Sequence, residues 1–226
     1  MSCCLRVLSS CVLLFAVAGC TQNGQKASDP PIKTAAGAKS AAGADTEAFQ
    51  VKFETSKGDF IVEVHPSWSP NGADHFRELV EAEFYDDCRF FRVLDGFMAQ
   101  FGINGDPAVH SKWGDANIQD DPVVQSNTRG YVTFAMTGAP NSRSTQIFVN
   151  YADRNSRLDD SGFSPFGQVI EGMDVVDSLY SGYGEGPPDG TGPNQGAIES
   201  SGNKYLDANY PKLDYIKRAR IVGGDE

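Results

Sequence analysis

The sequence predicts an all-β domain, a closed antiparallel barrel with helical caps. From Phe49 onward, short segments that alternate apolar and polar residues follow one another, and the links between them are rich in turn-forming residues. Only two segments repeat apolar residues at the spacing of a helix instead. Many short strands with turn-rich links are typical of barrels, so we expect the two helices to cap one.

A hairpin opens the domain. Phe49, Val51 and Phe53 alternate with polar residues, which predicts a half-buried strand. The turn-forming run 56–59 follows, and the alternation resumes over residues 60–64. Two alternating runs joined by a short turn predict two antiparallel neighbours.

The first helix is expected to begin at Ser69 and Pro70, because Ser is a preferred N-cap and Pro is tolerated at the first helical position. Its apolar face comprises Ala73, Phe76, Leu79 and Val80. The second helix is expected over residues 172–180, where apolar residues again recur at helical spacing.

The remaining strands complete the predicted sheet. They are expected over residues 89–93, 98–102, 130–136, 146–150, 166–170 and 213–222. Residues 181–211 are dense in Gly and Pro, which predicts a long loop. Within this loop the run 182–186 (GYGEG) has no helix directly after it, so we expect a plain surface loop and not a phosphate site.

The chain begins with a targeting signal rather than a fold element. Residues 1–20 combine a positive region at Arg6 with about a dozen apolar residues, too few to span a bilayer. The segment ends Val-Ala-Gly-Cys, which resembles a bacterial lipobox whose Cys20 receives the lipid; an ordinary signal peptide is the alternative. Residues 21–47 are small and polar and predict a flexible tether, which places the domain at 48–222.

A lipobox implies export across the inner membrane and a lipid anchor on the periplasmic face of the cell envelope. Thr21, and not Asp, follows Cys20, which favours the outer membrane. Of the five cysteines, three leave with the signal and Cys20 would be lipidated, so only Cys88 remains free and no intramolecular disulfide is expected. The apolar surroundings of Cys88 favour a buried packing role.

Composition argues against several partners and cofactors. The formal net charge is −11, and an acidic surface argues against nucleic acid and anionic headgroups. We therefore expect membrane contact through the lipid only, and a monomer. His65, His75 and His110 lack metal-ligand spacing, and the acids between Asp115 and Asp121 lack the calcium-loop pattern, so no metal or other cofactor is expected.

The stretch 90–102, FFRVLDGFMAQFG, carries the most specific chemical signal. It sets one fixed cation, Arg92, among apolar side chains and near the neutral amide of Gln100, without a histidine or a thiol. Such a set suits a reaction that needs no nucleophile and no proton transfer. Rotation about an Xaa-Pro bond is one, because its barrier of roughly 18–20 kcal/mol comes from amide resonance.

Three segments together resemble the cyclophilin-type peptidyl-prolyl isomerases. They are the stretch 90–102, residues 133–150 (TFAMTGAPNSRSTQIFVN) and residues 158–177 (LDDSGFSPFGQVIEGMDVVD). The resemblance covers about residues 49–180 and the last strand, and it implies a closed eight-stranded antiparallel barrel with a helix at each end. It also implies a groove that binds an Xaa-Pro polypeptide and accelerates isomerisation, here to assist the folding of exported proteins.

The resemblance assigns site residues by matching position. Arg92 matches the catalytic arginine, whose guanidinium is expected to donate to the prolyl nitrogen of the twisted amide. The walls of the proline pocket match Phe97, Met98, Phe148 and Leu158, the polar groups match Gln100 and Gln146, and the backbone that pairs with the substrate strand matches Thr137. We expect Phe97, Met98 and Phe148 to be partly exposed, because the family's groove is open.

The sequence also departs from the family. Arg157 stands where many relatives carry the Trp that contributes to cyclosporin binding, so weak cyclosporin sensitivity is expected. Phe163 stands where a pocket His is frequent. The Arg-Phe-His-Arg pattern of many relatives is Arg-Phe-Phe-Arg here, with Phe91 in place of the His.

Two other functions stay open on sequence alone. The altered rim and the 181–211 loop would also fit a catalytically weak cyclophilin-like module that binds proline-containing segments of an envelope partner. They would fit, less well, a structural lipoprotein whose loop docks on another protein. Acceleration of peptide exchange separates the enzyme from both.

Overall fold

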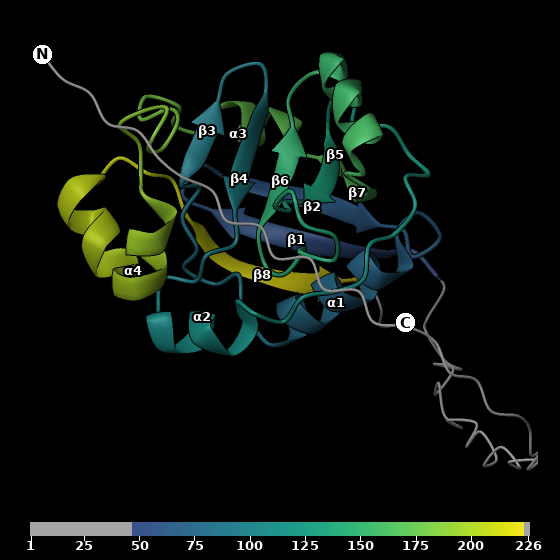
Figure 1. Cartoon of the computed structure of the whole chain (residues 1–226), viewed down its shortest axis with the longest axis horizontal. Helices are drawn as coiled ribbons and strands as arrows, with labels where there is room; N and C mark the ends of the chain where they lie inside the picture. The colour runs from purple at the N-terminus through teal and green to yellow at the C-terminus, as the bar shows by residue number, and fades with distance from the viewer. Residues whose placement is uncertain (1–46, 224–226) are drawn as a thin grey trace, which may run out of the picture. The chain divides into compact units, whose positions relative to one another are not determined.

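All eight predicted strands lie in one antiparallel sheet in the computed structural model, which describes residues 47–223. The strands are β1 (Phe49–Thr55), β2 (Asp59–Val64), β3 (Arg92–Leu94), β4 (Met98–Phe101), β5 (Tyr131–Phe134), β6 (Ile147–Asn150), β7 (Pro165–Glu171) and β8 (Ile216–Val222). Their order is β3-β4-β6-β5-β7-β2-β1-β8 (Figure 1). The predicted first hairpin is confirmed, with Phe53 paired to Phe60 across β1 and β2.

The sheet is a curled half-barrel. The strand ladder does not close, so the closed barrel expected from the sequence is wrong. β3 and β8 are its two edges. The chain segments just before these strands meet at an isolated bridge between Arg89 and Tyr215. β3 has only three residues, because the chain before it leaves the ladder at Phe91, whose side chain packs outside the core of the sheet.

Residues 47–223 contain more helix than the two expected segments. The α-helices are α1 (Pro70–Glu81), α2 (Pro107–Trp113), α3 (Met173–Asp177) and α4 (Gln195–Asn209), and a 3₁₀ helix spans Asp153–Ser161. The sequence predicts α1 and α3, but α4 replaces part of the expected 181–211 loop. The sequence pattern does not predict α4 because glycine lowers helix propensity, and Gly202, with a φ of 58°, interrupts the helix. Asn194 caps its N-terminus by accepting from the N–H of Ala197.

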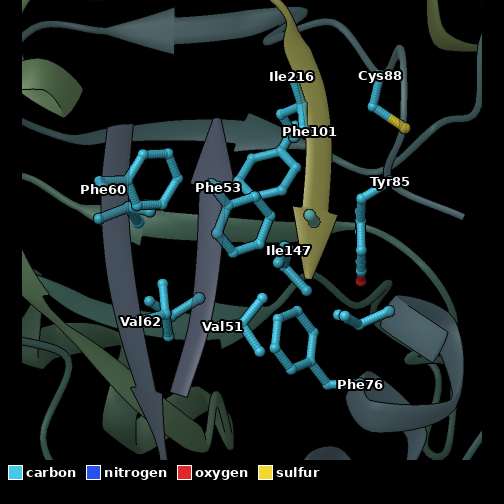
Figure 2. Close-up of a cluster of buried hydrophobic side chains, with 14 of the residues drawn as sticks. Val51, Phe53, Phe60, Val62, Phe76, Tyr85, Cys88, Phe101, Ile147 and Ile216 are labelled. Carbon is cyan, nitrogen blue, oxygen red and sulfur yellow. The ribbon is translucent and has the colours of Figure 1, made fainter. Parts of the chain in front are cut away.

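The main core lies between the sheet and α1. The predicted apolar face of α1 is buried, as are the inward residues of the strands. Phe53 and Phe60 stack with ring centroids 4.8 Å apart, and Phe101 meets Phe53 edge-on at 5.7 Å (Figure 2). Cys88 is fully buried in this core, in agreement with its expected packing role. Burial also raises the pKa of its thiol.

A second apolar cluster lies outside the main core. Its members are Phe91, Ile103, Ile198, Leu206 and Leu213, with Tyr183, Tyr205 and Tyr210 packed against them. The cluster packs residues 181–211, here called the excursion, against the chain just before β3, and α4 also contacts α2 (Figure 1). The excursion is therefore a packed wall of the domain.

The predicted signal peptide, Cys20 and the tether up to residue 46 lie outside the described residues. Within the part of the chain that the structure describes, we find no helix with the length and apolar character needed to cross a bilayer.

Candidate active site

The structure brings the eight residues that the sequence assigns to the site into one groove. The groove has a volume of about 710 Å³. Its lining includes Arg92, Phe97, Met98, Gln100, Thr137, Gln146, Phe148, Leu158 and the rim residue Phe163. Residues far apart in the chain thus form one binding surface.

Strand register explains why three of these side chains share a face. Arg92 pairs with Gln100 across β3 and β4, and Gln100 pairs with Phe148 across β4 and β6. Directly paired residues project to the same side of a sheet, and the next residues along project to the other side. Ala99 and Val149, which also pair, accordingly lie in the main core. The groove therefore occupies the sheet face opposite the core.

Two neighbours hold the guanidinium of Arg92. Its Nε and Nη2 donate to the two carboxylate oxygens of Glu185 at 2.7 and 2.6 Å. Its Nη1 donates to Oε1 of Gln100 at 2.9 Å and lies 3.9 Å from Sδ of Met98. The hydrogen bonds from Arg92 lower the pKa of Glu185 below its usual range, so this carboxylate is charged at neutral pH.

A chain of amides extends the polar side of the groove. Gln100 Nε2 donates to Oε1 of Gln146 at 2.8 Å, and Gln146 Nε2 donates to Oε1 of Gln195 at 3.1 Å. Because Gln100 also accepts from Arg92, each of the first two amides accepts at its oxygen and donates at its nitrogen. The polar wall is thereby ordered from Arg92 to the first residue of α4.

The apolar wall is more buried than expected. Phe97 is half-buried, as predicted, whereas Met98 and Phe148 are only 1 % and 5 % exposed; Leu158 is also half-buried. The difference follows from position, because Met98 and Phe148 lie within strands whereas Phe97 lies in the turn before β4. Phe163 meets Phe148 edge-on at 5.9 Å, so the residue at the frequent His position joins the apolar wall.

Thr137 lies exposed on the loop after β5. Its backbone N–H donates to Oγ of Ser142 at 2.9 Å, and that hydroxyl donates to the carbonyl of Ala139. A substrate strand that takes the N–H of Thr137 must therefore first displace Ser142.

The sequence misses the contribution of the excursion to the site. Glu185 belongs to the glycine-rich run expected to be a plain surface loop, and Gln195 and Glu199 line the groove from α4. Glu185 lies 93 residues after Arg92, so no periodicity connects the two. The one available signal is Phe91, an extra aromatic residue beside Arg92 that needs an apolar partner.

The three histidines lie apart from the groove. His65, His75 and His110 are not among its lining residues. Within residues 47–223, no group of His, Cys, Asp and Glu is arranged to hold a metal ion. The chemistry of the groove is therefore that of a guanidinium, amides and an apolar wall, with the carboxylate of Glu199 on the side formed by α4.

Comparison with known proteins gives a consistent match. Residues 50–198 match the sequence model described as cyclophilin type peptidyl-prolyl cis-trans isomerase/CLD. A peptidyl-prolyl cis-trans isomerase of Acinetobacter baylyi is 35 % identical over 133 residues, which cover 57 % of this chain and 70 % of the relative. Peptidyl-prolyl cis-trans isomerase B of Escherichia coli is 32 % identical over 136 residues, which cover 57 % of this chain and 82 % of the relative.

Solved structures show the same fold. A cyclophilin-type peptidyl-prolyl cis-trans isomerase of Cryptosporidium parvum aligns with a TM-score of 0.57 and 21 % identity, covering 79 % of this chain and 100 % of its own. That protein has also been crystallised in the presence of the dipeptide Ala-Pro. A cyclophilin from Hirschia baltica aligns with a TM-score of 0.53 and 21 % identity, covering 80 % of this chain and 77 % of its own.

Proposed function

This chain belongs to the cyclophilin-type peptidyl-prolyl cis-trans isomerase family, and from that premise we propose that its groove binds exported Xaa-Pro polypeptides with Arg92 as the catalytic residue. The protein is a peptidyl-prolyl cis-trans isomerase, the activity for which its relatives are named. The observation that carries the site assignment is the position of Arg92 at the edge of an apolar wall in one groove.

The chemistry follows from the nature of the amide barrier. At the twisted transition state conjugation is lost, and the prolyl nitrogen becomes a better hydrogen-bond acceptor. A guanidinium beside it stabilises that state more than either ground state, and arginine stays protonated without any tuning. An acceleration of about 10⁵ requires about 7 kcal/mol of such differential stabilisation.

The groove supplies the other requirements. A proline ring between Phe97, Met98 and Phe148 would be held away from water, which strengthens the interaction with Arg92. The Ala-Pro dipeptide used with the Cryptosporidium parvum relative has the chemistry that this pocket would accept. Gln100 already fixes Nη1 of Arg92, so little reorganisation is needed when substrate arrives.

A proline-isomerisation assay on the purified protein tests the assignment. Arg92→Ala should lower kcat/KM by about 100-fold or more, because it removes the donor at the reacting nitrogen. Arg218→Ala, which removes an exposed arginine of β8 paired with Glu54, is the matched control and should leave the rate unchanged. Equal rates for Arg92→Ala and the wild type would exclude Arg92 as the catalytic residue.

We also propose that the protein works in the cell envelope on a lipid anchor and assists the folding of exported proteins. The support is the sequence of residues 1–20 with its lipobox-like end at Cys20, a part of the chain outside the described residues. Uncatalysed prolyl isomerisation takes tens to hundreds of seconds, so newly exported chains would benefit from an isomerase nearby. The outer membrane is the favoured site because Thr21 follows Cys20.

Membrane fractionation tests the anchor. Cys20→Ser should move the protein from the membrane to the soluble fraction, because a lipid chain is the proposed attachment. Cys11→Ser changes another cysteine of the same segment and should leave partitioning unchanged. Membrane association of Cys20→Ser equal to that of the wild type would rule out the anchor.

One observation favours a catalytically weak binding module as the second candidate. Glu185 neutralises Arg92, and such a carboxylate could weaken the electrostatic effect of the guanidinium. A module of this kind would bind Pro-containing peptides saturably without accelerating their cis/trans exchange. Exchange spectroscopy on a bound peptide separates it from the enzyme.

A further inference from the structure

The ion pair between Glu185 and Arg92 is the feature of the groove that the isomerisation chemistry does not itself require. Both carboxylate oxygens accept from the guanidinium, which is the two-pronged geometry that fixes direction as well as distance. Arg92 is 25 % exposed and Glu185 33 % exposed, so the pair lies at the edge of the groove, partly shielded from solvent.

The backbone around Glu185 is closely packed. The N–H of Gly192 donates to the carbonyl of Glu185 at 2.8 Å, and the N–H of Gly186 donates to its side chain at 3.0 Å. A Cβ at Gly190 would lie 2.2 Å from the Glu185 carbonyl, and one at Gly192 would lie 2.8 Å from it. Only glycines allow this approach, so Gly190 and Gly192 let the chain pack directly against the backbone of Glu185.

The second apolar cluster connects the two chain segments that carry Arg92 and Glu185. Phe91 precedes Arg92, and Tyr183 lies two residues before Glu185, and both belong to that cluster. Tyr183 meets Tyr180 and Tyr210 edge-on, at 5.1 and 5.0 Å. The residues next to the guanidinium and next to the carboxylate are therefore packed into one body.

We propose that Glu185 is a positioning residue for the isomerisation, which holds the guanidinium of Arg92 so that Nη1 faces the groove. The carboxylate occupies Nε and Nη2, while Nη1 lies beside the groove residues Gln100 and Met98. A free arginine side chain loses rotamer entropy when it is fixed. Fixing it before substrate binds removes that cost from the transition state. The inference rests on the proposed role of Arg92.

The test compares charge and length at position 185 in the full chain. Glu185→Gln keeps the size of the side chain but removes its charge and one acceptor, so kcat should fall about 10-fold. KM for an Ala-Pro peptide should stay within about twofold, because the apolar wall is unchanged. Glu185→Asp, which restores the charge, should recover part of the rate. Asp189→Asn makes the same acid-to-amide change at an exposed position of the excursion and should leave kcat unchanged.

A double variant separates positioning from a structural effect. If Glu185 acts through Arg92, Glu185→Gln should cause no further loss in an Arg92→Ala background, measured by peptide exchange at high enzyme concentration. An equal loss in both backgrounds, or a kcat for Glu185→Gln equal to or above that of an active wild type, overturns the positioning role alone. A wild type that fails to accelerate exchange overturns the proposed function, and the inference falls with it.

Discussion

Asp121 and Arg143 form a buried ion pair, with 3.1 Å between Oδ2 and Nη2 and side chains that are 1 % and 2 % exposed. Asp121 also accepts from the backbone N–H groups of Asn71 and Gly72 in the first turn of α1. It thus performs the capping that the sequence assigns to Ser69, whose hydroxyl donates to Asp121 instead. The pair connects the start of α1 to the loop that leads into β6 and the groove.

Asp121→Asn should therefore lower the free energy of unfolding by about 3 kcal/mol, because it leaves a buried guanidinium without its nearest counter-charge. Denaturant unfolding measures the change. Asp120→Asn is the matched control, since Asp120 lies 3.5 Å from Nε of Arg143 but is 37 % exposed, and it should cost less than about 1 kcal/mol. Equal losses at the two positions would show that Asp121 has no special role.

The strands and α1 could be predicted because local pattern determines them. The alternation around Val51 and Phe53 places these residues in the core, and the helical spacing of Phe76 and Leu79 does the same for α1. The resemblance located Arg92 and its groove neighbours, and the register of β3, β4 and β6 explains why they meet. Their chemical roles stay predictions until the variants are measured.

The excursion could not be predicted because its order comes from tertiary packing. Its glycines, which signal a loop when considered alone, permit the close backbone approach at Glu185. Ile198 and Leu206 are the only apolar residues among the buried positions of α4, and Gly202, which lies between them, interrupts the helix. What stabilises α4 is contact with Phe91 and Leu213, residues distant in the chain.

Ile198→Ala should loosen the excursion without unfolding the sheet. Ile198 is fully buried in the second cluster, and truncating such a side chain costs about 2–4 kcal/mol. Hydrogen exchange should therefore quicken in residues 181–211 while β1 and β2 keep their protection. Ile170→Ala, at an exposed position, serves as the control. A uniform loss of protection, or none in the excursion, would contradict the idea of a separately packed wall.

Cyclosporin should inhibit this enzyme weakly. The guanidinium of Arg157 lies over the ring of Phe97 at 5.4 Å, on a ring that Arg92 also approaches at 5.7 Å. A charged, exposed side chain at this rim offers a cyclic apolar peptide less contact area than an indole would. Arg157→Trp should therefore lower the inhibition constant by about 10-fold or more, whereas Arg154→Trp on the same helix should not. Nanomolar inhibition of the unaltered protein would refute this account.

The rate of isomerisation should be independent of pH across the neutral range. Arg92 donates to Glu185 and lowers its pKa below the ordinary 4.5, so the carboxylate is charged in the folded protein throughout that range. A carboxyl group whose pKa is lowered on folding makes its full ionic contribution to the folded state at pH values above its ordinary pKa. It loses that contribution only as the pH falls through the lowered pKa. We therefore expect kcat to stay constant between about pH 6 and 8 and to fall only below pH 4.5. Glu185→Gln should lack that acid limb, because it has no carboxylate to protonate. A kcat profile with its midpoint near pH 6.5 would instead indicate a histidine. It would contradict this account, because none of the three histidines lines the groove.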